Sequence, residues 1–463
     1  MAQTYDLTKG KVSTVVLKFF FPLFFTNMLQ QLYNIADTII VGKGISDNAL
    51  AAVGNMSSLT FLVIGFSMGL ANGFSVSSSI SFGAKDYSKL RKVFAASIKL
   101  SIAIAIILTA LSMYFLRDVL ELLQTDPLII DDSLTYGYII FGGLVTTIAY
   151  NLCAFTLRSL GDSRTPFFAI VVSSIINVVL NYVFICVIGM GVEGAAIATI
   201  ISQVASTLIC IRKLRRIDIL KLTREDFKNA SSMYLELFRN GLPMALMNSI
   251  TAIGCMVVQY FVNDLSVAHT TAYAACSKYI NLFMQPGCTA GFAMSSFTSQ
   301  NYGAGQYKRI REGLHVCLKI AITSYVILGS TMMLVPETLA RFMMNETASI
   351  ELAKQFLPIC GVMLVFVDCL FIFRSGCQAM GHPFVPMCSG VVEMVMRIVT
   401  IYFLVDTLDF KATALAECAA WLSAFLLNFI AFEIFINTII KKNYSKNDDK
   451  NTYVKPRFRR RKV

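Results

Sequence analysis

Apolar runs of about 20 residues recur along the whole chain, separated by short polar segments. A run of that length crosses the hydrocarbon core of a bilayer as a helix. The pattern predicts twelve membrane-spanning helices, and several are longer than a direct crossing requires, which indicates tilt or extension beyond the bilayer. The predicted spans are 14–41, 49–82, 93–116, 131–157, 166–188, 192–211, 234–262, 269–300, 314–336, 350–379, 384–405 and 411–440.

The segments between the spans alternate in charge. Lys and Arg gather after spans 2, 4, 6 and 8 and in the tail, whereas the segments after spans 3 and 11 carry Asp and Glu. Basic loops stay in the cytoplasm, so both termini are predicted to be cytoplasmic in a multi-pass protein of the cell (plasma or inner) membrane. No small-residue cleavage site follows the first apolar run, which is therefore expected to be a retained span. The tail from about 443 is expected to be disordered.

The chain contains an internal repeat. Segments 83–91 and 303–311 share Gly, Ala, Tyr and a final Arg at matching positions. Two further pairs of segments are about equally far apart in the sequence. Segments 161–166 and 381–386 each begin with Gly and end with Pro, at the same separation of 220 residues. Segments 22–27 and 243–248 each begin with Pro and end with Asn, at a separation one residue longer. Three pairs in order at one separation indicate a duplicated unit, the commonest construction of a membrane transporter.

The repeat defines the predicted architecture, an all-α polytopic membrane protein with two six-helix lobes. Residues 1–211 form the N-terminal lobe, 212–233 a basic cytoplasmic linker, 234–440 the C-terminal lobe and 441–463 a basic cytoplasmic tail. Both lobes begin on the cytoplasmic side. They are therefore expected to be related by a pseudo-two-fold axis along the membrane normal.

Composition excludes other classes. The chain is 56% hydrophobic and 15% charged, with net charge +12, and its cations lie in loops, so the expected partner is the lipid bilayer and not nucleic acid. Twelve scattered cysteines without a C-x-x-C pair argue against disulfides or zinc. Phosphate-binding, zinc-protease and serine-hydrolase motifs are missing, so neither an enzyme nor a cofactor is expected.

Asp37 is the strongest candidate for chemistry inside the membrane. Gln30, Tyr33, Asn34 and Asp37 follow helical spacing and share one face of the first span. An ionisable residue inside the bilayer is costly and marks a functional site by default. This face must point at a cavity or a partner helix and not at lipid.

Spans 5 and 6 offer the partner groups. Asn177 and Asn181 lie one helical turn apart on one face, and Thr199 adds a hydroxyl. One carboxylate among amides, a phenol and hydroxyls suits a proton carrier or, because sodium prefers oxygen ligands, a sodium site with Asp37 as the anionic ligand. The alternative is a hydrogen-bonded cluster that only holds helices together.

Other polar residues allow structural interpretations. Glu393 and Arg397 lie one helical turn apart and are expected to pair. Lys278 either lines a central cavity or neutralises Asp368. The glycines at 65, 69 and 73 present a smooth helix face for close packing.

Six segments of the chain form a recognisable set, namely 37–42, 49–54, 83–84, 158–166, 191–199 and 299–305. Together they resemble the multidrug and toxic compound extrusion (MATE) family of cation-coupled antiporters, and the resemblance covers nearly the whole chain. The resemblance implies two lobes around a central cavity, with an N-lobe cation site at Gln30, Tyr33, Asp37, Asn177 and Thr199. Asn181 stands where some family members carry an acidic residue on span 5. Asn248 lies where other family members carry an acidic residue on span 7, and Asp368 lies near the acidic residue of the family's span 10.

The predicted function is therefore secondary active efflux of cationic amphipathic or apolar drug-like compounds in exchange for protons or sodium, coupled through Asp37. The alternatives are a lipid-linked precursor flippase, which usually has more spans and several cavity arginines, and an uncoupled channel. A receptor is not expected to carry this duplication. No feature demands an oligomer, so a monomer is expected.

Overall fold

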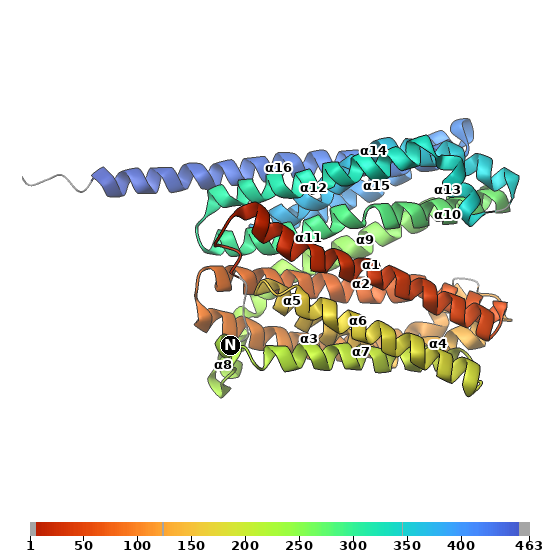
Figure 1. Cartoon of the computed structure of the whole chain (residues 1–463), viewed down its shortest axis with the longest axis horizontal. Helices are drawn as coiled ribbons and strands as arrows, with labels where there is room; N and C mark the ends of the chain where they lie inside the picture. The colour runs from red at the N-terminus through yellow and green to blue at the C-terminus, as the bar shows by residue number, and fades with distance from the viewer. Residues whose placement is uncertain (1–5, 123–124, 345, 453–463) are drawn as a thin grey trace, which may run out of the picture.

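The computed structural model describes residues 6–122, 125–344 and 346–452, and these are helical nearly throughout. Figure 1 shows the helices side by side in two groups, with the start of α1 and the end of α16 toward the same end of the bundle. The first group comprises α1 (Val12–Gly44), α2 (Asp47–Gly83), α3 (Tyr87–Leu122), α4 (Ile130–Gly142), α5 (Leu144–Ser159), α6 (Arg164–Asn181), η1 (Tyr182–Val187) and α7 (Val192–Leu214).

A connecting segment joins the two groups through η2 (Asp218–Leu220), α8 (Arg224–Lys228) and η3 (Asn229–Met233). The second group comprises α9 (Tyr234–Leu265), α10 (Val267–Phe283), α11 (Gln285–Gly303), α12 (Tyr307–Leu334), α13 (Pro336–Met343), α14 (Thr347–Ala379), α15 (Phe384–Leu408) and α16 (Phe410–Thr452). We call these groups the first and second halves.

The predicted spans correspond to these helices, although two spans are broken. Within the described residues, ten helices are long and apolar enough to cross a membrane, or up to eleven if the bent pair α4 and α5 counts as one span. This pair turns by 46° at Gly143. The remaining predicted span, 269–300, is divided between α10 and α11, which meet at Met284. The all-α, two-half architecture is confirmed.

The prediction of a disordered tail from about 443 is wrong for the part that the structure describes. Helix α16 continues to Thr452 and projects beyond the bundle in Figure 1. The sequence has neither Gly nor Pro between Phe410 and Pro456, so nothing stops the helix at the end of its apolar segment. The last part of the predicted tail, 453–463, lies outside the described residues.

The duplication extends to local backbone geometry. Ser46 caps α2 and Ser266 caps α10, each by accepting a hydrogen bond from a backbone amide in the first turn of its helix. Lys85 and Gly305 both have positive φ, at 58° and 71°. The turns that precede α6 and α15 also match, because the glycines at 161 and 381 have φ of 81° and 85°. The two copies therefore retain the same turns at corresponding positions, although Lys85 is less suited than glycine to this conformation.

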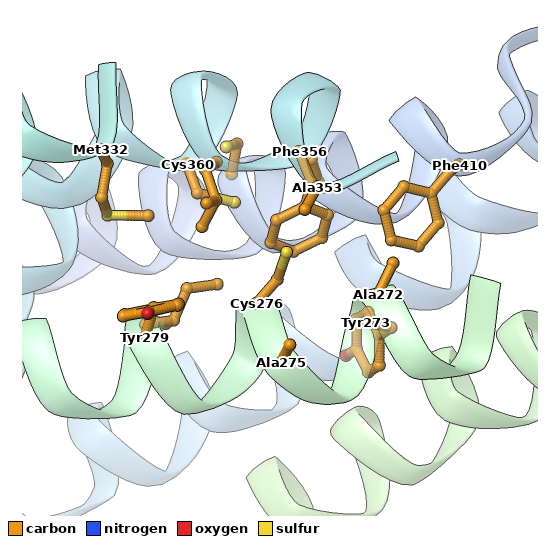
Figure 2. Packing of buried hydrophobic residues seen from close by; sticks show 14 of the residues in the cluster. Ala272, Tyr273, Ala275, Cys276, Tyr279, Met332, Ala353, Phe356, Cys360 and Phe410 are labelled. Carbon is orange, nitrogen blue, oxygen red and sulfur yellow. The ribbon is translucent and has the colours of Figure 1, made fainter. Parts of the chain in front are cut away.

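The core of the second half is formed by side chains of α10, α12, α14 and α16. Figure 2 shows Cys276 and Tyr273 of α10 facing Phe356 of α14, with Phe410 of α16 beside it. The rings of Phe356 and Phe410 lie 5.5 Å apart, and those of Tyr273 and Phe356 meet edge to face at 6.0 Å. Such van der Waals packing is the main source of cohesion between helices in lipid.

Glycines join the two halves through α2 and α9, as the stripe at 65, 69 and 73 predicts. A methyl group at Gly69 or Gly73 would approach the backbone of Ala245 or Gly241 closer than 3.0 Å, a separation that real side chains essentially never show. Gly65 has open space, and its carbonyl instead accepts a hydrogen bond from Asn248 at 3.0 Å. The stripe therefore permits backbone contact between the halves.

The halves also meet where α2 and α11 end, and here the contact is reciprocal. A methyl group at Gly83 would lie within 3.0 Å of the backbone of Gln300, and one at Gly303 within 3.0 Å of the backbone of Ile80. The Gln300 side chain donates to the Ser159 carbonyl at 2.7 Å. We call this end of the bundle, where α2, α5, α7 and α11 terminate, the basic end. The two repeated segments close the basic end against each other.

Helix α1 belongs to both halves. Its leading segment packs against α11 and α12, and the Arg309 guanidinium donates to the Gly10 carbonyl at 2.9 Å. Asn27 donates to Thr289 of α11 at 2.9 Å. Beyond Pro22, which interrupts the hydrogen-bond ladder of the helix, α1 continues along α6. One helix thus connects contacts of the second half to Asp37 in the first.

Candidate functional site

A polar cluster lies inside the first half, where α1, α6 and α7 meet. The Asn181 amide donates to Asp37 at 2.5 Å and to the Asn177 oxygen at 2.9 Å. Asn177 in turn donates to the Thr199 hydroxyl at 3.4 Å, and Thr199 donates to the Ala195 carbonyl at 3.0 Å. Four of the predicted side chains, from three separate helices, therefore form one connected network, namely Asp37, Asn181, Asn177 and Thr199.

The predicted site residues range from the surface to the interior. Gln30 and Asn34 are exposed, Tyr33 and Asp37 are half-buried, and the two asparagines of α6 are completely buried. The Tyr33 hydroxyl contacts the Thr199 hydroxyl of α7. The Asn181 side-chain oxygen is buried without a hydrogen-bond partner among the described residues, an unusual state for a buried acceptor. The site therefore offers a carboxylate, several neutral oxygens and one unsatisfied acceptor, and oxygen atoms are the ligands that hard cations prefer.

Tyr136 is a buried residue near the cluster that the sequence analysis did not single out. It is buried on α4 and lies near enough to interact electrostatically with Asp37 and Tyr33. It is one of several tyrosines in apolar runs, and its own run gives no sign of the direction in which its hydroxyl points. Only the packing of α4 against α7 and α2 brings it to the cluster.

The second half carries a different polar cluster, made of paired charges. Arg374 of α14 pairs with Glu393 of α15, and Arg397 lies 3.6 Å from the other oxygen of Glu393. Arg397 also binds Glu417 of α16 at 3.0 Å. The predicted pair of Glu393 and Arg397 is confirmed, and it is part of a buried network of two cations and two anions that joins α14, α15 and α16.

The two clusters occupy related positions in the two copies. At the separation that defines the repeat, Arg397 is the counterpart of Asn177. To within one position, Val258, which is completely buried, is the counterpart of Asp37. The second half thus has an arginine where the first has an amide, and an apolar side chain where the first has its acid. Its ion pairs balance one another, whereas Asp37 has amide and hydroxyl neighbours.

The remaining polar residues have separate locations. The hypothesis that Lys278 neutralises Asp368 is wrong, because Lys278 is exposed on α10 and no ion pair joins the two among the described residues. Asp368 is completely buried against Gly287, at the start of α11, and neither carboxylate oxygen has a hydrogen-bond partner in the part of the chain described. A helix N-terminus favours a nearby negative charge. The Asn248 side chain donates to the carbonyl of Gly65 in the first half at 3.0 Å.

Replacing Arg397 by Met is expected to destabilise the protein by about 3–5 kcal/mol, because it leaves Glu417 buried without its partner. The double variant Arg397→Met/Glu417→Met removes both charges and is expected to recover much of that loss. Thermal unfolding in detergent measures both effects.

The matched control is Arg341→Met, which breaks the exposed ion pair with Glu337 on α13. Little change is expected, because exposed pairs are screened by water. Equal destabilisation by Arg397→Met and Arg341→Met would contradict a structural role for the buried network.

The comparisons with known proteins agree with this geometry. The MatE family model matches twice, over residues 22–183 and 243–403. The Bacillus subtilis protein named "Probable multidrug resistance protein YoeA" is 28% identical over 342 residues, covering 72% of this chain and 73% of that protein. "Probable multidrug resistance protein YpnP" of the same species is 26% identical over 384 residues, covering 82% and 85%.

Among solved structures, an outward-facing multidrug resistance MATE family transporter of the MOP superfamily superposes with a TM-score of 0.88. The sequence identity is 21%, and the match covers 95% of this chain and 99% of that chain, so it shows a common fold. The protein is thus a multi-pass membrane protein with the fold of a transporter built from two repeats. The chain belongs to the MatE family, and the family model matches each of the two copies that the internal repeat predicts.

Proposed function

We propose that this transporter exports cationic amphipathic compounds in exchange for protons or sodium, and that Asp37 couples the two movements. The observation that carries the proposal is the contrast between the halves. Asp37 lies in a network of neutral groups, while the charges at the related position of the second half balance one another. An acid without a balancing cation is suited to take up and release one.

The position of Asp37 on α1 suggests how the binding of an ion to Asp37 changes the contact between the two halves. Asp37 contacts Asn181 beyond Pro22, and the residues just before α1, Leu7 and Gly10, are hydrogen-bonded to the second half. Binding of a proton or a sodium ion neutralises the negative charge of Asp37, which Asn181 contacts. This change favours a different position of the part of α1 that follows Pro22. Two states with different affinities for the ion are sufficient for coupling.

The orientation follows from the distribution of charge. The basic end carries the cation-rich segments after α2, α5, α7 and α11. Because basic loops stay in the cytoplasm, we infer that this end is cytoplasmic, together with the start of α1 and the described end of α16. The contact of Gly83 and Gly303 at that end then corresponds to a cytoplasmic gate that is closed. On this proposal, the substrate enters between the halves from the cytoplasm only when this contact opens.

The alternatives receive less support. A flippase for anionic lipid-linked precursors needs free arginines in its cavity, but Arg374 and Arg397 are buried and paired with glutamates. An uncoupled channel needs a continuous path, whereas backbone contacts between the halves close the basic end. The names of the two Bacillus subtilis relatives support drug-like substrates for this chain.

Proteoliposomes containing the purified protein test the proposal. Ethidium is expected to accumulate against its own concentration gradient when either a proton gradient or a sodium gradient is imposed. This accumulation is expected to stop when the matching ionophore collapses the imposed ion gradient. The two gradients applied separately identify the coupling ion. Ethidium that equilibrates at the same rate with and without either gradient would contradict antiport and support a channel.

A further inference from the structure

A deep apolar groove opens on the outer side of the first half, away from the polar cluster. Its volume is about 650 Å³, and it lies between α3 and α7 with α5 as its floor. Its lining comes from these helices and from the segment around η2, and no lining side chain comes from α9–α16. Ile102 and Val145 in its wall are exposed. The groove therefore faces the surrounding bilayer and not the space between the halves.

The depth of the groove matches one leaflet. On α3 the lining runs from Phe94 to Ala105, a stretch of about three helical turns that corresponds to roughly 16 Å along the helix axis. The hydrocarbon core of a bilayer is about 30 Å thick, so the groove extends from the basic end to about the middle of the membrane. An extended acyl chain of one leaflet has this length and chemistry.

The entrance of the groove is cationic. Arg215 follows the last residue of α7, Lys221 follows η2, and both are exposed and line the groove at its basic end. Residues 212–221 contain five cations and one acid. That acid, Asp218, pairs with Lys221 at 2.6 Å, but the pair is exposed and can exchange for another anion. Apolar walls beneath a basic rim fit an anionic amphiphile.

From this arrangement we propose that the groove binds an anionic phospholipid of the cytoplasmic leaflet. One acyl chain lies along α5 between α3 and α7, and the phosphate contacts Arg215 and Lys221. A zwitterionic headgroup is less suited, because its ammonium group would approach the same two cations. Leu220 and Leu222 also line the groove, so a bound lipid contacts the segment that joins the halves. The cytoplasmic placement of the groove rests on the orientation proposed above.

Native mass spectrometry of the purified full-length protein tests this site with two probes, phosphatidylglycerol and phosphatidylcholine with identical acyl chains. Wild type is expected to retain phosphatidylglycerol at concentrations about tenfold lower than phosphatidylcholine. Arg215→Gln/Lys221→Gln is expected to remove this preference. Ala149→Phe, which fills the groove from α5, is expected to weaken the binding of both lipids.

The matched control is Arg224→Gln/Lys228→Gln, which removes two exposed cations of the same connecting segment outside the groove and is expected to behave as wild type. Ala149→Leu replaces Ala149→Phe if the larger side chain lowers the melting temperature. Equal loss of preference in the control, or wild-type binding in the Arg215/Lys221 variant, would overturn the proposal.

Two competition experiments separate the lipid from other ligands of similar chemistry. Glycerol 3-phosphate carries a phosphate without acyl chains and is expected not to displace phosphatidylglycerol. Displacement at similar concentration would indicate a simple anion site and overturn the lipid assignment. Tetraphenylphosphonium, a cationic transport substrate analogue, is also expected not to compete, and competition would instead assign the groove to the transported compound. Neither result depends on whether Asp37 couples transport.

Discussion

Asp37→Asn is expected to abolish gradient-driven drug accumulation without unfolding the protein. Asparagine keeps the size of the side chain and can still bond with Asn181, which lies 2.5 Å from the carboxylate. It can neither gain a proton nor provide the negative charge that attracts sodium. Ethidium uptake into proteoliposomes under an imposed gradient is expected to fall to the level of empty vesicles, while the melting temperature stays near that of wild type.

The matched control for this variant is Asp118→Asn, which makes the same chemical change at an exposed acid on α3. Transport by this variant is expected to equal that of wild type. Gradient-driven accumulation by Asp37→Asn at the wild-type rate would show that coupling does not pass through this carboxylate. Asp368, a buried acid of the second half whose carboxylate oxygens have no hydrogen-bond partner among the described residues, would then be the next candidate.

Gly83→Ala is expected to disrupt the closure of the basic end and to reduce transport strongly. The added methyl group would overlap the backbone of Gln300, which cannot move away as a flexible side chain could. Overpacking typically costs about 1–3 kcal/mol, which corresponds to a change of roughly 5- to 150-fold in the equilibrium between closed and open states. Gly303→Ala is expected to have the same effect on transport, because its added methyl group would overlap the backbone of Ile80 in the opposite half.

Hydrogen–deuterium exchange measures this effect directly. Backbone amides near the ends of α2 and α11 are expected to exchange faster in Gly83→Ala than in wild type. The matched control is Gly54→Ala in the same helix, where an added methyl group meets nothing within 4 Å. Unchanged exchange and transport in Gly83→Ala would mean that the contact of the repeated segments does not control access.

Much of this molecule is predictable from its sequence because the patterns are local. Apolar length identifies the spans, and helical spacing identifies the polar faces around Asp37 and around Asn177 and Asn181. Because such a face cannot point at lipid, the two faces are expected to meet, and in the structure they do. The repeat is visible because its turns require particular residues, such as Gly161 and Gly381 at positive φ.

Other features depend on the relative rotation and position of helices distant in sequence, which no local pattern encodes. Arg374 and Glu417 lie on helices other than that of Glu393 and Arg397, so helical spacing predicts only the pair within α15. Asp368 faces the start of α11 because span 269–300 breaks at Met284, and apolar length alone does not reveal that break. Of the two alternatives for Lys278, the ion pair with Asp368 is not found among the described residues, because Lys278 is exposed on α10.

The central claim is that a symmetric scaffold carries a single coupling acid, Asp37, in its first half. It is tested most directly by measuring drug and ion fluxes in the same proteoliposomes, with a pH-sensitive dye for protons and radioactive sodium for sodium ions. Wild type is expected to exchange drug for one of these ions at a fixed ratio, and Asp37→Asn to show no drug-dependent ion flux. A fixed, undiminished ratio in Asp37→Asn would contradict the account.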